Sequence, residues 1–192
     1  MSAAAPAPGS ARRRALLDAA YGYVLAHGLS DLSLRPLAAA IGSSPRVLLF
    51  LFGSKDGLVQ AILGRAREEE LTALDGVRRA GAAGGLPAAG AAIWAWLAAP
   101  EHRALLTLWV EGYGRSLVEP DGAWAGFAAR TVNDWLTVLD EVGGGDEVDR
   151  TLLLAVLRGA LLDLLATGDA VRPGAAVARH LRNPDDSVGA LP

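Results

Sequence analysis

A chain of 192 residues that is 52% hydrophobic and carries a net charge of −3 can form one large or two small domains with a sizeable core. It contains no cysteine, which excludes disulfides and thiolate metal sites. No apolar run is long enough to cross a bilayer, and residues 1–14 lack the apolar segment of a signal peptide, so we expect a cytoplasmic protein without a membrane partner.

The charge is unevenly distributed along the chain. Residues 1–65 hold seven basic and three acidic residues, a net charge of +4, so the remainder carries −7. A basic first third on an acidic body favours phosphate binding at one end of the molecule.

The chain begins with a low-complexity segment, residues 1–9, for which we expect a disordered arm. A first helix is predicted from about Ser10 to His27 and ends at Gly28. Its expected buried face, spaced as in an amphipathic helix, consists of Leu16, Ala19, Ala20, Tyr23 and Val24.

Two very short helices separated by a glycine turn follow in residues 33–58. Ser33 and Ser44 stand at N-cap positions, and Gly42 and Gly53 stand where each helix should end. Apolar side chains at helical spacing, from Leu34 to Phe52, provide the anchoring face. Such a compact pair suits the major groove of DNA, and an ordinary hairpin in a helical core is the alternative.

The rest of the chain also has a helical pattern. We predict helices at about 55–79, 88–98, 100–118, 120–142, 147–167 and 173–182, with a break at 81–87 and a frayed tail at the end. The polar cluster Arg65 to Glu70 is expected on a solvated face. No strand pattern is evident, so the predicted fold class is all-α.

Residues 12–63 resemble the TetR family of bacterial transcriptional repressors. The resemblance rests on Leu-Leu-Asp-Ala-Ala (16–20), His-Gly-Leu (27–29), Ile-Gly-Ser-Ser (41–44) and above all Phe-Gly-Ser-Lys-Asp-Gly-Leu (52–58). It implies a three-helix, helix-turn-helix DNA-binding domain and a helical domain for effector binding and dimerisation. The expected domains are an arm at 1–9, the DNA-binding domain at 10–56, the effector domain at 57–183 and a tail at 184–192.

The candidate DNA-binding residues are basic, hydroxyl or turn-forming side chains of the first third. Arg46 is placed to read guanine or to contact phosphate, and Lys55 matches the phosphate-contacting lysine of the family. Leu49 and Phe50 stand where polar contacts are usual; a contact with a thymine methyl group and simple packing both remain open. The full set is Arg12, Arg13, Arg14, Ser33, Arg35, Ser43, Ser44, Pro45, Arg46, Leu49, Phe50 and Lys55.

All five tryptophans lie beyond residue 90, interleaved with small residues. Such rings can line an apolar cavity or simply fill a core. By the resemblance, this region would hold a small apolar or aromatic effector. The candidate lining residues are Trp94, His102, Trp109, Glu111, Tyr113 and Phe127.

Residues 151–167 are apolar almost all round, so a helix there must be buried on more than one side. We expect the helix to form a homodimer interface, with a central core helix as the alternative. The candidate interface residues are Leu153, Leu157, Gly159, Ala160, Leu161 and Leu164.

No catalytic motif, cofactor motif or metal-ligand spacing is evident, because the three histidines are far apart and no glycine-rich phosphate loop follows a strand. The preferred hypothesis is a ligand-responsive, homodimeric repressor that binds a near-palindromic DNA operator and is not an enzyme. The alternative is a helical small-molecule-binding or interaction protein with weak or lost operator binding, because the second short helix offers few polar groups to bases.

Overall fold

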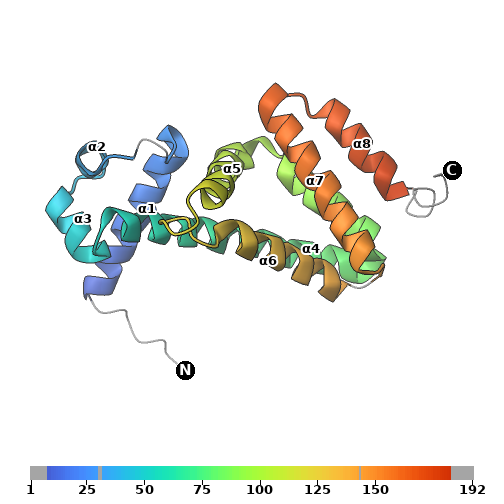
Figure 1. Cartoon of the computed structure of the whole chain (residues 1–192), viewed down its shortest axis with the longest axis horizontal. Helices are drawn as coiled ribbons and strands as arrows, with labels where there is room; N and C mark the ends of the chain where they lie inside the picture. Colours follow the sequence, from blue (N-terminus) through green and yellow to red (C-terminus); the bar gives the residue numbers. More distant parts are fainter. Residues whose placement is uncertain (1–7, 30–31, 143, 183–192) are drawn as a thin grey trace. The chain divides into compact units, whose positions relative to one another are not determined.

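The protein, represented by a computed structural model, is described over residues 8–29, 32–142 and 144–182. Most of the predicted arm and all of the predicted tail, residues 184–192, lie outside these ranges. Within them the prediction of an all-α fold is confirmed, and no strand is present (Figure 1). The helices are α1 (Pro8–His27), α2 (Leu34–Ala40), α3 (Pro45–Phe52), α4 (Lys55–Ala98), the 3₁₀ turn η1 (Pro100–His102), α5 (Arg103–Val118), α6 (Phe127–Val142), α7 (Glu147–Thr167) and α8 (Val171–Arg182).

The break predicted at residues 81–87 occurs inside α4 and is narrower than expected. Only Gly84 and Gly85 leave the helical conformation, and Gly85 adopts φ 63° and ψ −156°, a region that is essentially restricted to glycine. Pro87 lies in the first turn after the break, where its missing N–H group leaves no hydrogen bond unmade.

Three local predictions are wrong. Helix α6 begins at Phe127 rather than at residue 120, because residues 120–126 form successive turns that end at Gly126, with φ 68°. Glu70 does not belong to a solvated face: it is 5% exposed and accepts a hydrogen bond from the indole N–H of Trp135. In α1, Ala19 of the expected buried face is exposed, and Tyr21 is buried instead.

The chain forms two compact units. Unit 1 comprises residues 1–69 and 108–128, and unit 2 comprises residues 70–107 and 129–192. The predicted domain boundary at residues 56 and 57 remains a prediction, since compactness alone does not define it. The core of unit 1 contains Val24, Leu37, Leu48, Leu58 and Ile62, all nearly inaccessible to solvent.

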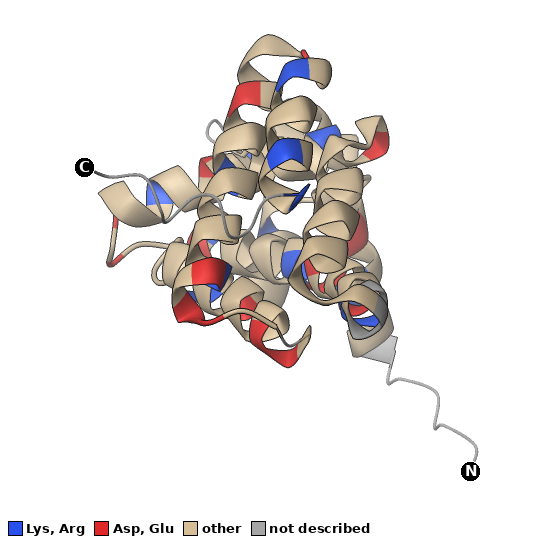
Figure 2. Cartoon of the chain, turned by 90° about the vertical axis from the view of Figure 1, so that its right-hand side faces the viewer, with Lys and Arg blue, Asp and Glu red and all other residues tan. Residues whose placement is uncertain are grey.

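Unit 2 is built on the second part of α4, most of α6, and the helices α7 and α8, which lie side by side (Figure 1). Asp146 and Asp149 form a reciprocal capping box that begins α7, and Gly168 ends it. Acidic and basic residues are interspersed along the helices of the face shown in Figure 2.

The prediction of a dimer face on α7 is wrong for five of its six residues. The side chains of Leu153, Leu157, Ala160, Leu161 and Leu164 fill the core of unit 2, and each is less than 10% exposed. Gly159 is the exception and is exposed. The core alternative therefore describes this face of α7.

No single helix among the described residues is long and apolar enough to cross a membrane; the one bent pair that passes on length and composition is α2 with α3.

Candidate nucleic-acid interface

Helices α2 and α3 form a compact pair bent by 102°. Ser44 begins α3, and its hydroxyl accepts a hydrogen bond from the backbone N–H of Val47 at 3.3 Å, while Pro45 occupies the first helical position. Leu48 and Phe52 anchor one face of α3 in unit 1, with 1% and 8% of their surfaces exposed. The opposite face of α3 is thereby presented to solvent.

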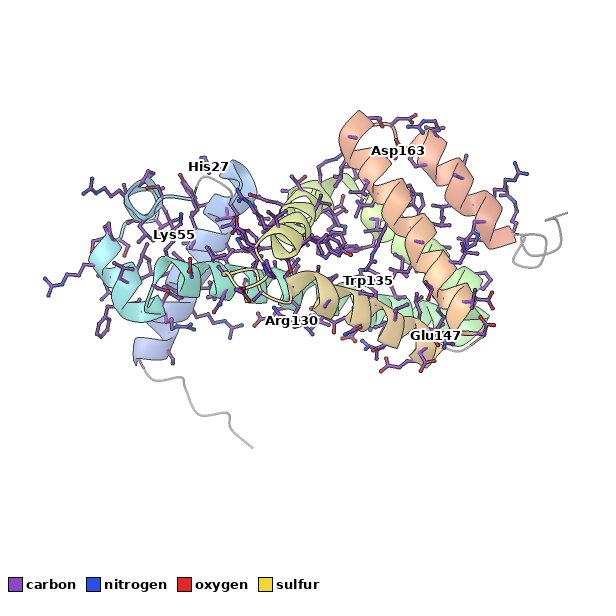
Figure 3. The ribbon with its side chains drawn as sticks, in the orientation of Figure 1. His27, Lys55, Arg130, Trp135, Glu147 and Asp163 are labelled. Carbon is purple, nitrogen blue, oxygen red and sulfur yellow. The ribbon has the colours of Figure 1, made fainter. Side chains whose placement is uncertain are left out.

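Exposed cationic side chains occur on α2, on α3 and at the start of α4. Residues 32–55 contain Arg35, Arg46 and Lys55 and no acidic residue. All three basic side chains are exposed, and Lys55 occupies the first position of α4 (Figure 3). The segment itself carries a charge of +3, and Asp31 and Asp56 adjoin its two ends. It therefore attracts a polyanion more strongly than the net charge of the whole chain suggests.

Arg13 has a structural role that the sequence does not predict. Its Nε donates to the carbonyl of Leu51 at 3.3 Å, and its guanidinium lies 4.9 Å from the centre of the Phe52 ring. The last carbonyls of a helix lack partners within the helix, so Arg13 stabilises the end of α3. Arg12 and Arg14 are exposed on α1.

The three candidate serines differ in what their hydroxyls can contact. Ser33 precedes α2 at its N-cap position but makes no capping hydrogen bond with its side chain. The Oγ atom of Ser43 is buried and makes no hydrogen bond, so a phosphate cannot reach it in this rotamer. Ser33 and Ser44 are exposed, and both hydroxyls can donate to a phosphate.

Phe50 does not pack in the core, so the packing interpretation is wrong for this residue, whereas Leu49 is partly covered. Leu49 is 41% exposed and Phe50 is 86% exposed. Both lie on the solvent side of α3, together with Arg46.

A hydrogen-bond network holds α1 against the start of α4 within unit 1. Arg65 pairs with Asp18 at 3.2 Å and with Glu69 at 3.5 Å, and the Tyr21 hydroxyl donates to Glu69 at 3.0 Å. Burial, followed by the hydrogen bond to Glu69, raises the pKa of Tyr21 above its ordinary value.

Glu111, predicted as a polar anchor of an effector pocket, connects α5 to the end of α1. Its carboxylate accepts a hydrogen bond from the backbone N–H of Leu29 at 3.1 Å, and Leu29 is buried. The contact spans 82 residues of sequence, which is why local patterns do not reveal it.

The six candidate effector residues fall into both units. Trp109, Glu111, Tyr113 and Phe127 belong to unit 1, whereas Trp94 and His102 belong to unit 2. The rings of Trp109 and Tyr113 are 5.2 Å apart, and the indole N–H of Trp109 is buried without a hydrogen-bond acceptor. Phe127 packs against Gly112 so closely that a Cβ atom there would lie 3.1 Å from its ring.

In unit 2, His102 stacks on Trp96 at 4.5 Å between ring centres, and its Nδ1 lies 2.8 Å from the Trp96 carbonyl. Trp135 of α6, which bonds the buried Glu70, is labelled in Figure 3. This carboxylate–indole pair is a buried polar site that the sequence analysis missed, because its two residues are 65 positions apart.

Unit 2 also contains a cavity of about 320 Å³ beside the break in α4. Its lining is mainly apolar, and none of the six predicted effector residues contributes to it. Asp149 and His180 are its ionisable members, and the lining includes Leu86, Pro87, Leu152 and Leu181. No group of three or more candidate metal ligands occurs in the described part of the chain.

Known proteins resemble the chain both locally and over its length. Residues 16–62 match the family model of bacterial regulatory proteins of the tetR family. A structure described as a TetR transcription regulator from Haloarcula marismortui ATCC 43049 is similar over 91% of this chain and 98% of its own, with 18% identity and a TM-score of 0.72. A transcriptional regulator from Rhodococcus sp. Rha1 is similar over 94% and 99%, with 21% identity and a TM-score of 0.73.

The multidrug binding protein EbrR, in a structure complexed with proflavin, is similar over 88% of this chain and 99% of its own, with 26% identity and a TM-score of 0.65. No curated protein sequence matches the chain.

Proposed function

We propose, from the premise that the chain belongs by its N-terminal domain to the tetR family of bacterial regulatory proteins, that it controls transcription by binding duplex DNA as a homodimer. The observation that carries this proposal is the capped α2–α3 pair with its three exposed cations and no acid between residues 32 and 55. In the proposed complex α3 enters the major groove, while Lys55, Ser33 and Ser44 contact phosphates.

A homodimer needs a face that a second copy can reach, and the outward side of α7 provides one. Val148, Leu152, Ala155, Gly159, Leu162 and Ala166 are all exposed and recur at alternating intervals of four and three residues. This spacing forms a single apolar stripe of the kind that pairs helices. We infer that the stripe, rather than the buried face of α7, joins two copies around a two-fold axis.

An effector that releases the protein from DNA is the second part of the proposal. Half-buried rings, the buried donor of Trp109 and the cavity beside Leu86 favour a small apolar or aromatic molecule. The likeness to EbrR, a multidrug binding protein complexed with proflavin, makes proflavin the first ligand to test. If the unliganded protein is the state that binds DNA, the protein acts as a repressor.

Selection of bound sequences from random DNA duplexes tests the DNA-binding function. A dimer should enrich an inverted repeat whose half-sites are about 34–36 Å apart, and its affinity should fall steeply as salt rises. Enrichment of no inverted repeat, with affinity independent of salt, would favour the alternative of a helical ligand-binding protein without operator binding.

A further inference from the structure

Phe50, on the outward face of α3, is the most exposed phenylalanine of the chain. Of the three phenylalanines, Phe52 and Phe127 are buried, with 8% and 6% of their surfaces exposed, whereas Phe50 is 86% exposed. Leu49, its neighbour, is 41% exposed. The Phe50 side chain contributes little to the core, so its role lies in what contacts it from outside, and Leu49 presents part of its surface beside it.

Arg46, Leu49 and Phe50 share one side of α3. Residues three and four positions apart are neighbours on a helix surface, so Leu49 and Phe50 both stand one turn after Arg46. Leu48 and Phe52 point the other way, into the core of unit 1. The face that would enter a groove therefore combines one guanidinium group with two apolar side chains.

The chemistry of the major groove limits what these apolar side chains can recognise. A phenyl ring and an isobutyl group neither donate nor accept hydrogen bonds, so they cannot distinguish the polar edges of adenine, guanine or cytosine. The C5-methyl group of thymine is the apolar group that a natural base pair presents there. From these residues we infer that Phe50, supported by Leu49, reads a pyrimidine C5-methyl group.

This inference rests on the proposed DNA-binding function and extends it to specificity. Four residues of helix rise about 6 Å, and successive base pairs of B-DNA are about 3.4 Å apart. The methyl group should therefore lie within about two base pairs of the position that Arg46 reads. DNA is favoured over a protein partner because residues 32–55 hold three basic residues and no acid, which suits a polyanion.

Replacement of each thymine of the selected operator by deoxyuridine, one position at a time, tests the inference because only the methyl group is removed. At one position in each half-site, affinity should fall about fourfold per methyl group lost. Replacing that thymine by cytosine should weaken binding, and replacing it by 5-methylcytosine should recover part of the loss.

Variants assign the effect to the side chain. The F50A protein should bind the thymine and deoxyuridine operators equally, and V171A, which alters a residue that is 81% exposed on α8, should keep the discrimination. Sensitivity to deoxyuridine at no position, or discrimination that persists in F50A, would overturn the inference while DNA binding stands. A protein that binds no duplex would overturn the proposed function itself, and loss of the dimer in F50A would assign the ring to self-association instead.

Discussion

At the scale of single residues, the structure separates side chains that position α3 from those that are exposed to solvent. Arg13 bonds the end of α3, whereas Arg46 and Lys55 are exposed. The two exposed cations differ in place: Arg46 is in the helix proposed to enter the groove, and Lys55 is at the first position of the following helix. Base reading and phosphate binding should therefore be separable by substitution.

Arg46→Ala should relax the preference at one base position and cost about 1–3 kcal/mol on the preferred sequence, because a bidentate guanine contact is lost. Lys55→Ala should weaken all sequences alike and flatten the salt dependence by about one unit, because one phosphate contact is lost. Titration of the selected operator and its single-base variants at several salt concentrations measures both effects. Uniform weakening by Arg46→Ala would reassign that residue to phosphate.

The buried Tyr21 should make stability depend on alkaline pH. Because the folded state raises the pKa of Tyr21, the unfolded chain releases the phenolic proton first, and stability falls as pH rises above about 10. Below that pH the contribution is fully present.

Urea unfolding between pH 8 and pH 11 measures this effect. Tyr21→Phe should remove a large part of the decline above pH 10, and Tyr113→Phe serves as a matched tyrosine substitution elsewhere in unit 1. An unchanged decline in Tyr21→Phe would show that another group controls alkaline stability.

At the scale of helices, local signals predicted the elements well and long-range contacts escaped them. The cap at Ser44, the ends at Gly42 and Gly53, and the bounds of α7 were all readable, because caps and turns depend on neighbouring residues. The carboxylate of Glu111 on Leu29 and that of Glu70 on Trp135 were not, because their partners are distant in sequence. The same limit applies to α7. Its apolar composition predicted that the helix is buried, but not which of its faces packs within its own unit.

The outward stripe of α7 gives a prediction about assembly. Leu162 is 52% exposed in the single chain, so Leu162→Glu should leave the fold intact and separate the dimer, because the charge would be buried unpaired between two copies. DNA affinity should fall with it. Leu157→Ala, at a position 1% exposed, is the contrasting variant and should destabilise the fold by about 2–5 kcal/mol.

Sedimentation and circular dichroism distinguish these outcomes. A helical monomer for Leu162→Glu supports the stripe as the interface. A Leu162→Glu protein that remains dimeric would move the interface to another surface.

At the scale of the whole molecule, the proposed switch requires that an effector bind the DNA-incompetent state more tightly than the competent state. Proflavin should quench tryptophan fluorescence and lower operator affinity. Two variants distinguish the two candidate sites. Leu86→Trp fills the cavity, and Trp109→Phe keeps a ring but removes the buried donor. If proflavin quenches the fluorescence of the wild-type protein but leaves its operator affinity unchanged, the result would contradict the proposed switch. It would still indicate a binding site for proflavin.

The way the chain builds unit 1 has a consequence for its biosynthesis. The unit is assembled from residues 1–69 and 108–128, so its last segment is made roughly sixty residues after its first segment is complete, several seconds later at ordinary rates of translation. Until then Leu29 lacks the carboxylate of Glu111, and the helix-turn-helix leaves the ribosome before the helix that completes it. A chimera that transplants this DNA-binding module to another dimerising protein must therefore carry both segments.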